Sequence, residues 1–285
     1  MIDLCDYAQL TALLARHGFR FDKSKGQNFL IDASVPEAIA ESCPTGPDYG
    51  IVEIGPGVGC LTQQLAARAQ KILAYEVDHR LKPVLNETLA EHTNVELLFT
   101  DVMRADLNAD IRAHLTGLRP VVCANLPYNI TTPVLTKLYE ARCFEQILVM
   151  VQKEVADRIA AKPSTPDYGS FSVFSQWYCV PEILFTVEPE CFCPAPKVRS
   201  AVVRLTVRDE VPFSVPPAEY FRVVRAAFGQ RRKTLSNALG SVFGKETASI
   251  AIRACGLDEK IRGENLSPAQ FAVVTEELIK LTATH

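Results

Sequence analysis

Short apolar runs alternate with longer amphipathic stretches along the first two-thirds of the chain. Such runs are typical of buried strands, whereas apolar spacing of three and four is typical of helices. The predicted strands are residues 51–54, 71–77, 95–99, 120–124 and 146–152, and the predicted helices are residues 61–68, 81–91 and 133–138. Two β-rich stretches, residues 177–187 and 201–207, flank a proline-rich loop and are predicted to end the sheet. The pattern predicts an α/β fold with a doubly wound sheet.

The pattern changes after Arg208. Residues 211–217 contain three prolines, and four stretches with helical spacing follow, at residues 218–228, 233–243, 247–255 and 268–282. Ser267 and Pro268 supply a cap and a first-turn proline for the last helix. We therefore predict a sheet domain at residues 1–209, with an N-terminal segment at residues 1–35, and a small helical domain at residues 210–285.

Composition excludes several classes of protein. No apolar run approaches the roughly 20 residues of a membrane span, and the N-terminus lacks the features of a signal peptide. The nine cysteines are scattered, and the close pair Cys191 and Cys193 lacks a second Cys or His cluster. We therefore expect no metal site, no disulfide, no membrane association and a location in the reducing cytoplasm.

Charge is distributed unevenly, although the net charge is only −3. Residues 199–245 carry nine Lys or Arg against three acidic residues. A basic stretch of this kind is either a solvated helix face or a surface that contacts nucleic acid, and charge by itself leaves both interpretations open.

A glycine-rich turn follows the first predicted strand. Gly55, Gly57 and Gly59 allow the backbone to come close to a ligand before the helix begins. Their spacing departs from the Gly-x-Gly-x-x-Gly of dinucleotide enzymes, because Cys60 stands at the position of the third glycine. The turn alone is therefore a weak indication of a nucleotide-type site.

Two acidic residues at strand ends sharpen this interpretation. Glu76 follows the glycine turn by about 20 residues, where a carboxylate accepts both ribose hydroxyls in nucleotide folds. Asp101, after the third strand, is placed to accept from an adenine amino group. Taken singly, each acid is equally well a helix cap or a solvated loop residue.

The turn Asn125–Tyr128 follows the fourth predicted strand. An amide oxygen and a backbone carbonyl can accept the two N–H bonds of a flat amine, and an aromatic ring can stack on the base that carries it. Ligands of open α/β sheets bind beyond the carboxyl ends of strands, so Asn125 and Gly55 should face one crevice. A hydride-transfer enzyme does not require this turn, which favours methylation of an exocyclic amino group.

Five stretches in order extend the match over nearly the whole chain. They are Lys25–Leu30, Glu53–Gly59, Asn125–Tyr128, Phe192–Val198 and Arg231–Leu235. Through them the chain resembles the ribosomal RNA adenine dimethyltransferases, the KsgA family that modifies small-subunit rRNA. The resemblance implies a Rossmann-like class I methyltransferase sheet, S-adenosylmethionine as donor with S-adenosylhomocysteine as product, and N6 of two adjacent adenines near the 3′ end of 16S rRNA as acceptors. Lys25 departs from the apolar or aromatic residue that the family usually has there.

The resemblance also assigns roles to individual residues. The predicted donor-binding residues are Asn28 and Leu30 from the N-terminal segment, Gly55 at the methionine part together with Gly57 in the same turn, Glu76 at the ribose, Asp101 at the adenine, and Asn125 at both donor and target. The predicted catalytic residues are Asn125, Leu126, Pro127, Tyr128 and Phe192. In this mechanism the Asn125 oxygen and the Leu126 or Pro127 carbonyl accept from N6, while Tyr128 and Phe192 stack on the base. The alternative for Phe192 is an anchor for its proline-rich loop.

The basic residues would position the RNA through its phosphates. They are Arg222, Arg225, Arg231, Arg232 and Lys233. The predicted partner is an immature small ribosomal subunit, bound by a monomer. Two alternatives are a non-catalytic assembly or quality-control factor and a large-subunit dimethyltransferase of the macrolide-resistance type. Residues 231–235 and 264–268 resemble the small-subunit branch.

Overall fold

The described part of the chain, residues 2–20, 27–230 and 232–283, folds into two compact units in this computed structural model. The first unit comprises residues 1–156 and 182–207, and the second comprises residues 157–181 and 208–285. The second unit therefore includes residues 157–181, which lie within the N-terminal domain of the sequence prediction. No helix among the described residues is long and apolar enough to cross a membrane.

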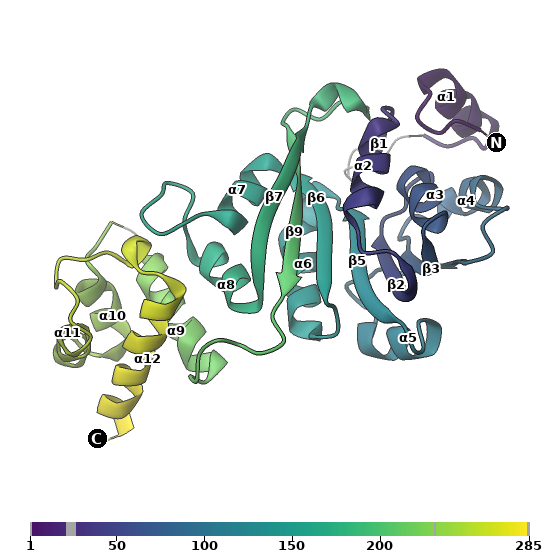
Figure 1. The fold of residues 1–285 in the computed structure, drawn as a ribbon. Coiled ribbons are helices and arrows are strands. Elements are labelled where there is room, and N and C mark those ends of the chain that lie inside the picture. Colours follow the sequence, from purple (N-terminus) through teal and green to yellow (C-terminus); the bar gives the residue numbers. More distant parts are fainter. Residues whose placement is uncertain (1, 21–26, 231, 284–285) are drawn as a thin grey trace. The chain divides into compact units, whose positions relative to one another are not determined.

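A seven-stranded sheet has the order β4-β3-β2-β5-β6-β9-β7 (Figure 1). The strands are β2 Gly46–Ile54, β3 Ala69–Tyr75, β4 Val95–Leu98, β5 Arg119–Asn125, β6 Gln146–Gln152, β7 Cys179–Val187 and β9 Ser200–Val207. Strands β2 to β6 pair in parallel, and β9 runs antiparallel to β6. The carboxyl ends of β2, β3 and β5 therefore lie at one edge of the sheet, and the predicted doubly wound α/β fold is confirmed.

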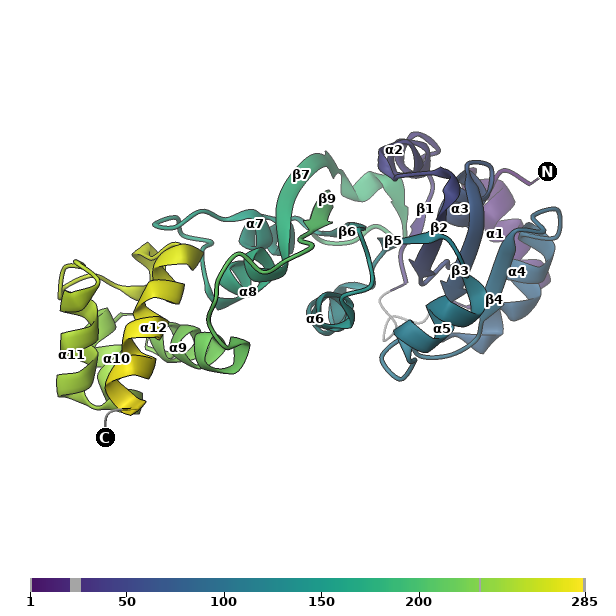
Figure 2. The same ribbon diagram turned by 60° about the horizontal axis from the view of Figure 1, so that its bottom comes forward.

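Helices cover both faces of this sheet (Figure 2). In the first unit they are α1 Tyr7–Arg16, α2 Ser34–Ser42, α3 Cys60–Ala66, η2 His79–Leu81, α4 Lys82–Thr88, α5 Leu107–His114, η3 Tyr128–Ile130 and α6 Thr131–Ala141. On one face Leu65 of α3 packs with Ile51 and Ile72 of the sheet, all fully buried. On the other face Tyr75 donates a hydrogen bond to Asp110 of α5 at 2.8 Å. Burial on both faces explains why the central strands β5 and β6 contain continuous apolar runs.

A second, two-stranded sheet joins distant parts of the chain. Strand β1 (Phe29–Leu30) pairs antiparallel with β8 (Phe192–Cys193), which follows η4 (Pro189–Cys191). The N–H of Ile31 extends the pairing by donating to the Cys191 carbonyl at 2.8 Å. This sheet brings two of the recognised sequence stretches together, although nothing in their separate patterns predicts the pairing.

The second unit is helical. Its elements are α8 Ser170–Tyr178, α9 Pro217–Gly229, α10 Leu235–Phe243, α11 Lys245–Ala254, η5 Gly263–Asn265 and α12 Pro268–Ala283, and α7 Lys153–Ala160 leads into it. The four predicted C-terminal helices are confirmed as α9 to α12. The predicted strand at residues 177–187 is wrong at its start, because Trp177 and Tyr178 end α8. Trp177 is buried against Tyr220, with ring centroids 4.2 Å apart, and this packing outweighs its β propensity.

Candidate functional site

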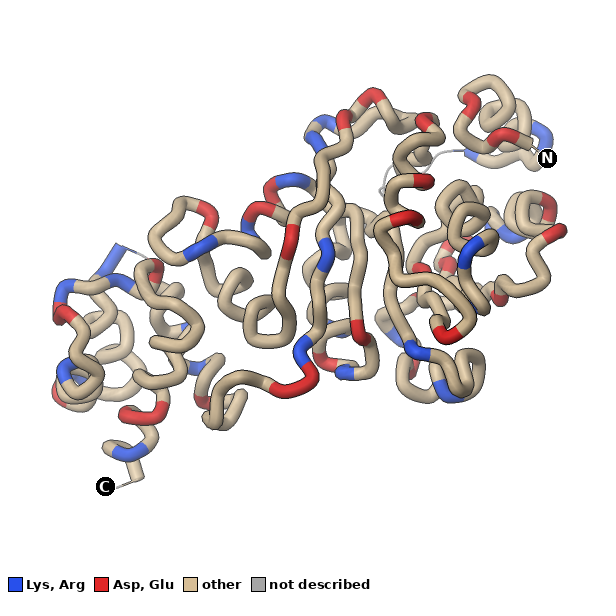
Figure 3. The backbone as a smooth tube through the Cα atoms, viewed as in Figure 1, with Lys and Arg blue, Asp and Glu red and all other residues tan. Residues whose placement is uncertain are grey.

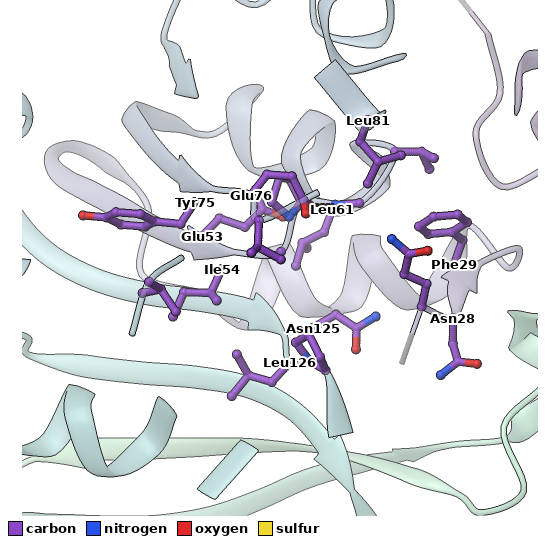
Figure 4. A pocket seen from close by; sticks show the side chains of 18 of the residues that line it. Asn28, Phe29, Glu53, Ile54, Leu61, Tyr75, Glu76, Leu81, Asn125 and Leu126 are labelled. Carbon is purple, nitrogen blue, oxygen red and sulfur yellow. Dashed lines mark hydrogen bonds between the residues drawn. The ribbon is translucent and has the colours of Figure 1, made fainter. Parts of the chain in front are cut away.

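A cavity opens at the carboxyl ends of β2, β3 and β5 (Figure 4). It encloses about 1020 Å³ of space between the atoms, including space open to solvent. Its lining includes Asn28, Leu30, Gly55, Gly57, Glu76, Asp101, Asn125, Leu126, Pro127 and Tyr128. The structure therefore brings together every residue predicted to bind the donor and every residue of the Asn125–Tyr128 turn.

The glycine turn forms one wall of the cavity. Gly55 and Gly57 have φ angles of +71° and +63°, in the left-handed region that costs an L side chain energy. A Cβ built on Gly57 would lie 3.1 Å from the ring of Phe29. Glycine at position 57 is thus needed both for the left-handed turn and for the close approach of strand β1. Because these glycines have no side chains, a ligand can come close to the backbone of the turn.

Glu76 follows β3 and reaches the glycine turn. One carboxylate oxygen accepts from the Asp78 N–H at 2.8 Å, and the other accepts from the Gly57 N–H at 3.3 Å. The residue is 5% exposed, and this burial raises the pKa of Glu76. Beside it Val77 lines the cavity and is 54% exposed, so it offers apolar surface to a flat ring. The sequence analysis missed Val77, whose only signal is its place after the acid.

Asp101 lies in the loop between β4 and α5. Its Oδ1 accepts from the Met103 N–H at 2.9 Å, and its carbonyl oxygen accepts from the Arg104 N–H at 2.9 Å. The adjoining Val102 is buried and lines the cavity. Asp101 therefore stabilises its own loop and lines the cavity.

The turn after β5 leaves one backbone acceptor available. The Leu126 N–H donates to the Met150 carbonyl at 3.1 Å, and the Pro127 carbonyl accepts from the Ile130 N–H at 3.2 Å and from Thr131 Oγ1 at 3.1 Å. No described residue donates to the Leu126 carbonyl oxygen. Of the two carbonyls considered from the sequence, that of Leu126 is the one with free capacity. Figure 4 shows the Asn125 amide directed into the open space of the cavity.

The two predicted stacking residues are placed differently. Tyr128 lines the cavity, its hydroxyl hydrogen-bonds with Ser200, and burial raises the pKa of the phenol. Phe192 is only 3% exposed, does not line the cavity, and packs in a core cluster that includes Leu30. This placement is that of a loop anchor, the alternative considered for Phe192, and its stacking role stays a prediction.

Glu53 is a buried acid in the cavity wall that the sequence analysis left without a role. It lies in β2 with 1% exposure, and among the described residues its Oε2 has no hydrogen-bond partner. Burial raises the pKa of Glu53 to about 8, so the carboxyl is largely protonated at neutral pH. The signal in the sequence was an acid inside an otherwise apolar strand.

The basic residues of the second unit are surface side chains. Arg222, Arg225, Arg232 and Lys233 are exposed, whereas Arg231 lies outside the described residues, as do Lys25 and Gly26. Arg222 pairs with Glu219 at 3.4 Å and lies over the Phe243 ring at 4.6 Å. Figure 3 shows Lys and Arg in both units, so positive charge is not confined to the predicted stretch.

The lining suits S-adenosylmethionine by its shape and chemistry. The glycine turn leaves room for a ligand, Glu76 supplies a carboxylate, and Val77 and Val102 supply apolar surface for a ring. No three His, Cys, Asp or Glu side chains within the described ranges form a group that could hold a metal ion.

A doubly wound sheet with these residues at its carboxyl edge defines a class I S-adenosylmethionine-dependent methyltransferase. The model of the ribosomal RNA adenine dimethylase family matches residues 18–280. The chain belongs to this family, as its sequence stretches had indicated.

Relatives of known name support the same placement. The chain is 45% identical over 287 residues to ribosomal RNA small subunit methyltransferase A of Geobacillus thermodenitrificans, covering 98% of each chain. It is 43% identical to the protein of that name from Anoxybacillus flavithermus, covering 97% of this chain and 96% of the relative. The crystal structure of the 23S rRNA methyltransferase ErmE matches with a TM-score of 0.69 and 28% identity, covering 88% of this chain and all of that one. A dimethyladenosine transferase from Plasmodium falciparum shares the fold, with a TM-score of 0.74 and 22% identity over 88% of this chain and 97% of that one.

Proposed function

We propose that the protein transfers methyl groups from S-adenosylmethionine to N6 of two adjacent adenines near the 3′ end of small-subunit rRNA. The product is dimethyladenosine, formed during biogenesis of the small ribosomal subunit. One observation supports this proposal most directly: Asn125 and Leu126, whose carbonyl oxygen accepts no hydrogen bond from the described residues, line the same cavity as the residues assigned to the donor. The names of the relatives at 43–45% identity support the small subunit as the substrate.

The chain's own residues make N6 of the target adenine reactive. The lone pair of this nitrogen is delocalised into the ring, so its two N–H bonds must leave the ring plane. Asn125 Oδ1 and the Leu126 carbonyl oxygen each accept a hydrogen bond from one of these N–H groups. They also stabilise the positive charge that develops on nitrogen. Tyr128 stacks on the extruded base. S-adenosylmethionine supplies an electrophilic methyl group on sulfur, and the proton lost from nitrogen passes to water.

The donor is held by residues on both sides of the glycine turn. Asn28, Leu30, Gly55 and Gly57 surround its methionine part, whereas Glu76 accepts from the ribose hydroxyls and Asp101 accepts from the adenine amino group. The buried carboxylate of Glu76 and the left-handed glycines support these assignments.

The helical region contacts the RNA backbone. We assign phosphate contacts to Arg222, Arg225, Arg231, Arg232 and Lys233, within a helical domain at residues 210–285 that binds the ribosomal particle. Residues 1–209 carry the methyltransferase chemistry. The protein acts in the cytoplasm as a monomer on an immature small subunit.

Transfer of tritium from labelled S-adenosylmethionine tests the proposal. Unmethylated small subunits should accept label that nucleoside analysis recovers as dimethyladenosine, whereas large-subunit rRNA should accept little. Label in large-subunit rRNA alone would favour the activity of the ErmE type. Binding of small subunits without any transfer would favour a non-catalytic assembly factor.

A further inference from the structure

A lysine of α6 holds the loop that carries Asp101. Lys137 Nζ donates to the Met103 carbonyl at 3.0 Å and to the Ala105 carbonyl at 2.6 Å. The lysine is half-buried, and its ammonium is held by two backbone carbonyls of the loop. Hydrogen bonds between a charged donor and a carbonyl are stronger than neutral ones, and here one ammonium makes two.

No other described residue outside this loop hydrogen-bonds to it. Its own turns run from the Met103 N–H to Asp101 Oδ1 at 2.9 Å and from the Ala105 N–H to the Val102 carbonyl at 3.3 Å. These bonds connect near neighbours only. Among the described residues, the hydrogen bonds of Lys137 alone connect residues 101–105 to another element. Within the described ranges, Lys137 is therefore the hydrogen-bonding link between the loop that carries Asp101 and helix α6.

Helix α6 also hydrogen-bonds to the Asn125–Tyr128 turn, called the acceptor turn below. Helix α6 begins at Thr131, whose hydroxyl donates to the Pro127 carbonyl at 3.1 Å. Lys137 follows along the same helix, about 9 Å further at a rise of about 1.5 Å per residue. One rigid element thus contacts both the turn that holds the target amine and the loop that is assigned to the donor adenine.

We propose that Lys137 is a positioning residue for recognition of the donor adenine. By holding the carbonyls of Met103 and Ala105, it fixes the Asp101 carboxylate where that group accepts from the amino group of the adenine ring. This proposal rests on the proposed function, because it assigns the adenine end of the donor to Asp101. We therefore expect loss of Lys137 to reduce the preference for an amino group over a carbonyl oxygen at position 6 of the purine. Affinity for the rest of the donor should change less.

Two ligands that differ at that position provide the test. S-adenosylhomocysteine carries the amino group, whereas S-inosylhomocysteine carries a carbonyl oxygen that a carboxylate cannot accept from. Their dissociation constants are measured by calorimetry for the wild type, Lys137→Met, Lys137→Arg, Asp101→Ala and the double variant Lys137→Met with Asp101→Ala. Lys71→Met, at a lysine paired with Glu96 at 3.2 Å, serves as the matched control.

The wild type and Lys71→Met should bind S-adenosylhomocysteine about 10- to 100-fold more tightly than the inosine analogue. Lys137→Met should reduce this ratio by about 5-fold or more, Lys137→Arg should retain most of it because guanidinium also donates to two carbonyls, and the double variant should match Asp101→Ala. Melting temperatures check folding, and Lys137→Gln replaces Lys137→Met if the latter does not fold.

Equal weakening of both ligands in Lys137→Met would overturn the proposal, since a merely structural lysine leaves the ratio unchanged. An unchanged ratio in Asp101→Ala would also overturn it, because Lys137 would then position nothing that reads the ring. If the wild type binds neither ligand, the proposed function fails as well. If the wild type binds S-adenosylhomocysteine tightly and transfers methyl groups, but Lys137→Met leaves the affinity ratio of the two ligands unaltered, only the role of Lys137 is contradicted and the proposed function stands.

Discussion

The hydroxyl of Tyr128 lies 2.6 Å from Oγ of Ser200, which is fully buried at the start of β9. The bond connects the last residue of the acceptor turn to a strand that is distant in sequence and lies beyond β6 in the sheet. It fixes the hydroxyl end of the side chain, and so the position of the ring that we propose stacks on the base.

Tyr128 variants separate the ring from its hydroxyl. Tyr128→Ala should lower single-turnover methylation by about 10- to 100-fold, because stacking on a base contributes about 1–3 kcal/mol. Tyr128→Phe and Ser200→Ala should have smaller effects, and Ser200→Ala should act through orientation of the ring while donor affinity stays the same. Equal activity of Tyr128→Ala and the wild type would remove Tyr128 from the base site.

Asn125→Ala should reduce the rate of the first methyl transfer by about 10² to 10³, the usual cost of losing one preorganised acceptor in a transition state. Single-turnover assays on unmethylated small subunits measure this rate. The matched control is Asn108→Ala, at an exposed asparagine that donates to the Ala141 carbonyl. A variant that dimethylates at nearly the wild-type rate would show that the amide has no catalytic role.

Glu76→Gln should weaken binding of S-adenosylhomocysteine by about 10-fold or more, because hydrogen bonds to a charged acceptor contribute about 1.5–3 kcal/mol. In the wild type, affinity should fall as the pH is lowered. Since burial raises the pKa of Glu76, this fall begins at a higher pH than for an ordinary glutamate. Calorimetry across pH measures both effects, with Glu87→Gln at the surface as control. A pH-independent affinity would contradict the assignment.

Glu53 should make folding stability depend on pH. Its pKa is raised from 4.5 to about 8, so between these values the folded state binds more protons than the unfolded state. The free energy of unfolding should therefore decrease as pH rises through this window, by up to about 1.4 kcal/mol per pH unit. Urea titrations from pH 5 to pH 8.5 should show that Glu53→Gln lacks this contribution. Parallel curves for the two proteins would mean that Glu53 is not protonated in the folded state.

Neutralising the exposed arginines should change the salt dependence of particle binding. Arg225→Gln and Arg232→Gln should each remove one phosphate contact and so lower the slope of log affinity against log salt by about 0.7 to 0.9. Arg222→Gln should change it less, because Arg222 is already paired with Glu219. Binding of S-adenosylhomocysteine provides the control and should be unaffected. An unaltered slope would identify this stretch as a solvated helix face.

Much of the fold was predictable from local pattern. The central strands β2, β3, β5 and β6 are largely buried, so each contains an apolar run, and α9 to α12 carry helical spacing, with an identifiable start at Ser267 and Pro268 for α12. The end of α8 was mistaken for strand because Trp177 and Tyr178 favour strands by local preference. Only their packing with Tyr220 and Phe221 makes this segment helical.

The residue types of the site were also visible in the chain. Gly55, Asp101 and Asn125 each follow a predicted strand, Glu76 lies at the end of one, and parallel strands bring their carboxyl ends to one edge. Local order along the chain therefore determined the class of fold and the residues that line the cavity.

The tertiary structure decided which groups are free to act. The Pro127 carbonyl is engaged by its near neighbours Ile130 and Thr131, which leaves the Leu126 carbonyl available, but this depends on how the turn and helix α6 fold. The hydrogen bonds of Lys137 to the Asp101 loop join residues more than 30 positions apart, so they have no local signal. Burial likewise depends on the neighbours that folding supplies. It places Phe192 in the core beside Leu30 and raises the pKa of Glu53, because both environments exist only once β1, β8 and the sheet have assembled.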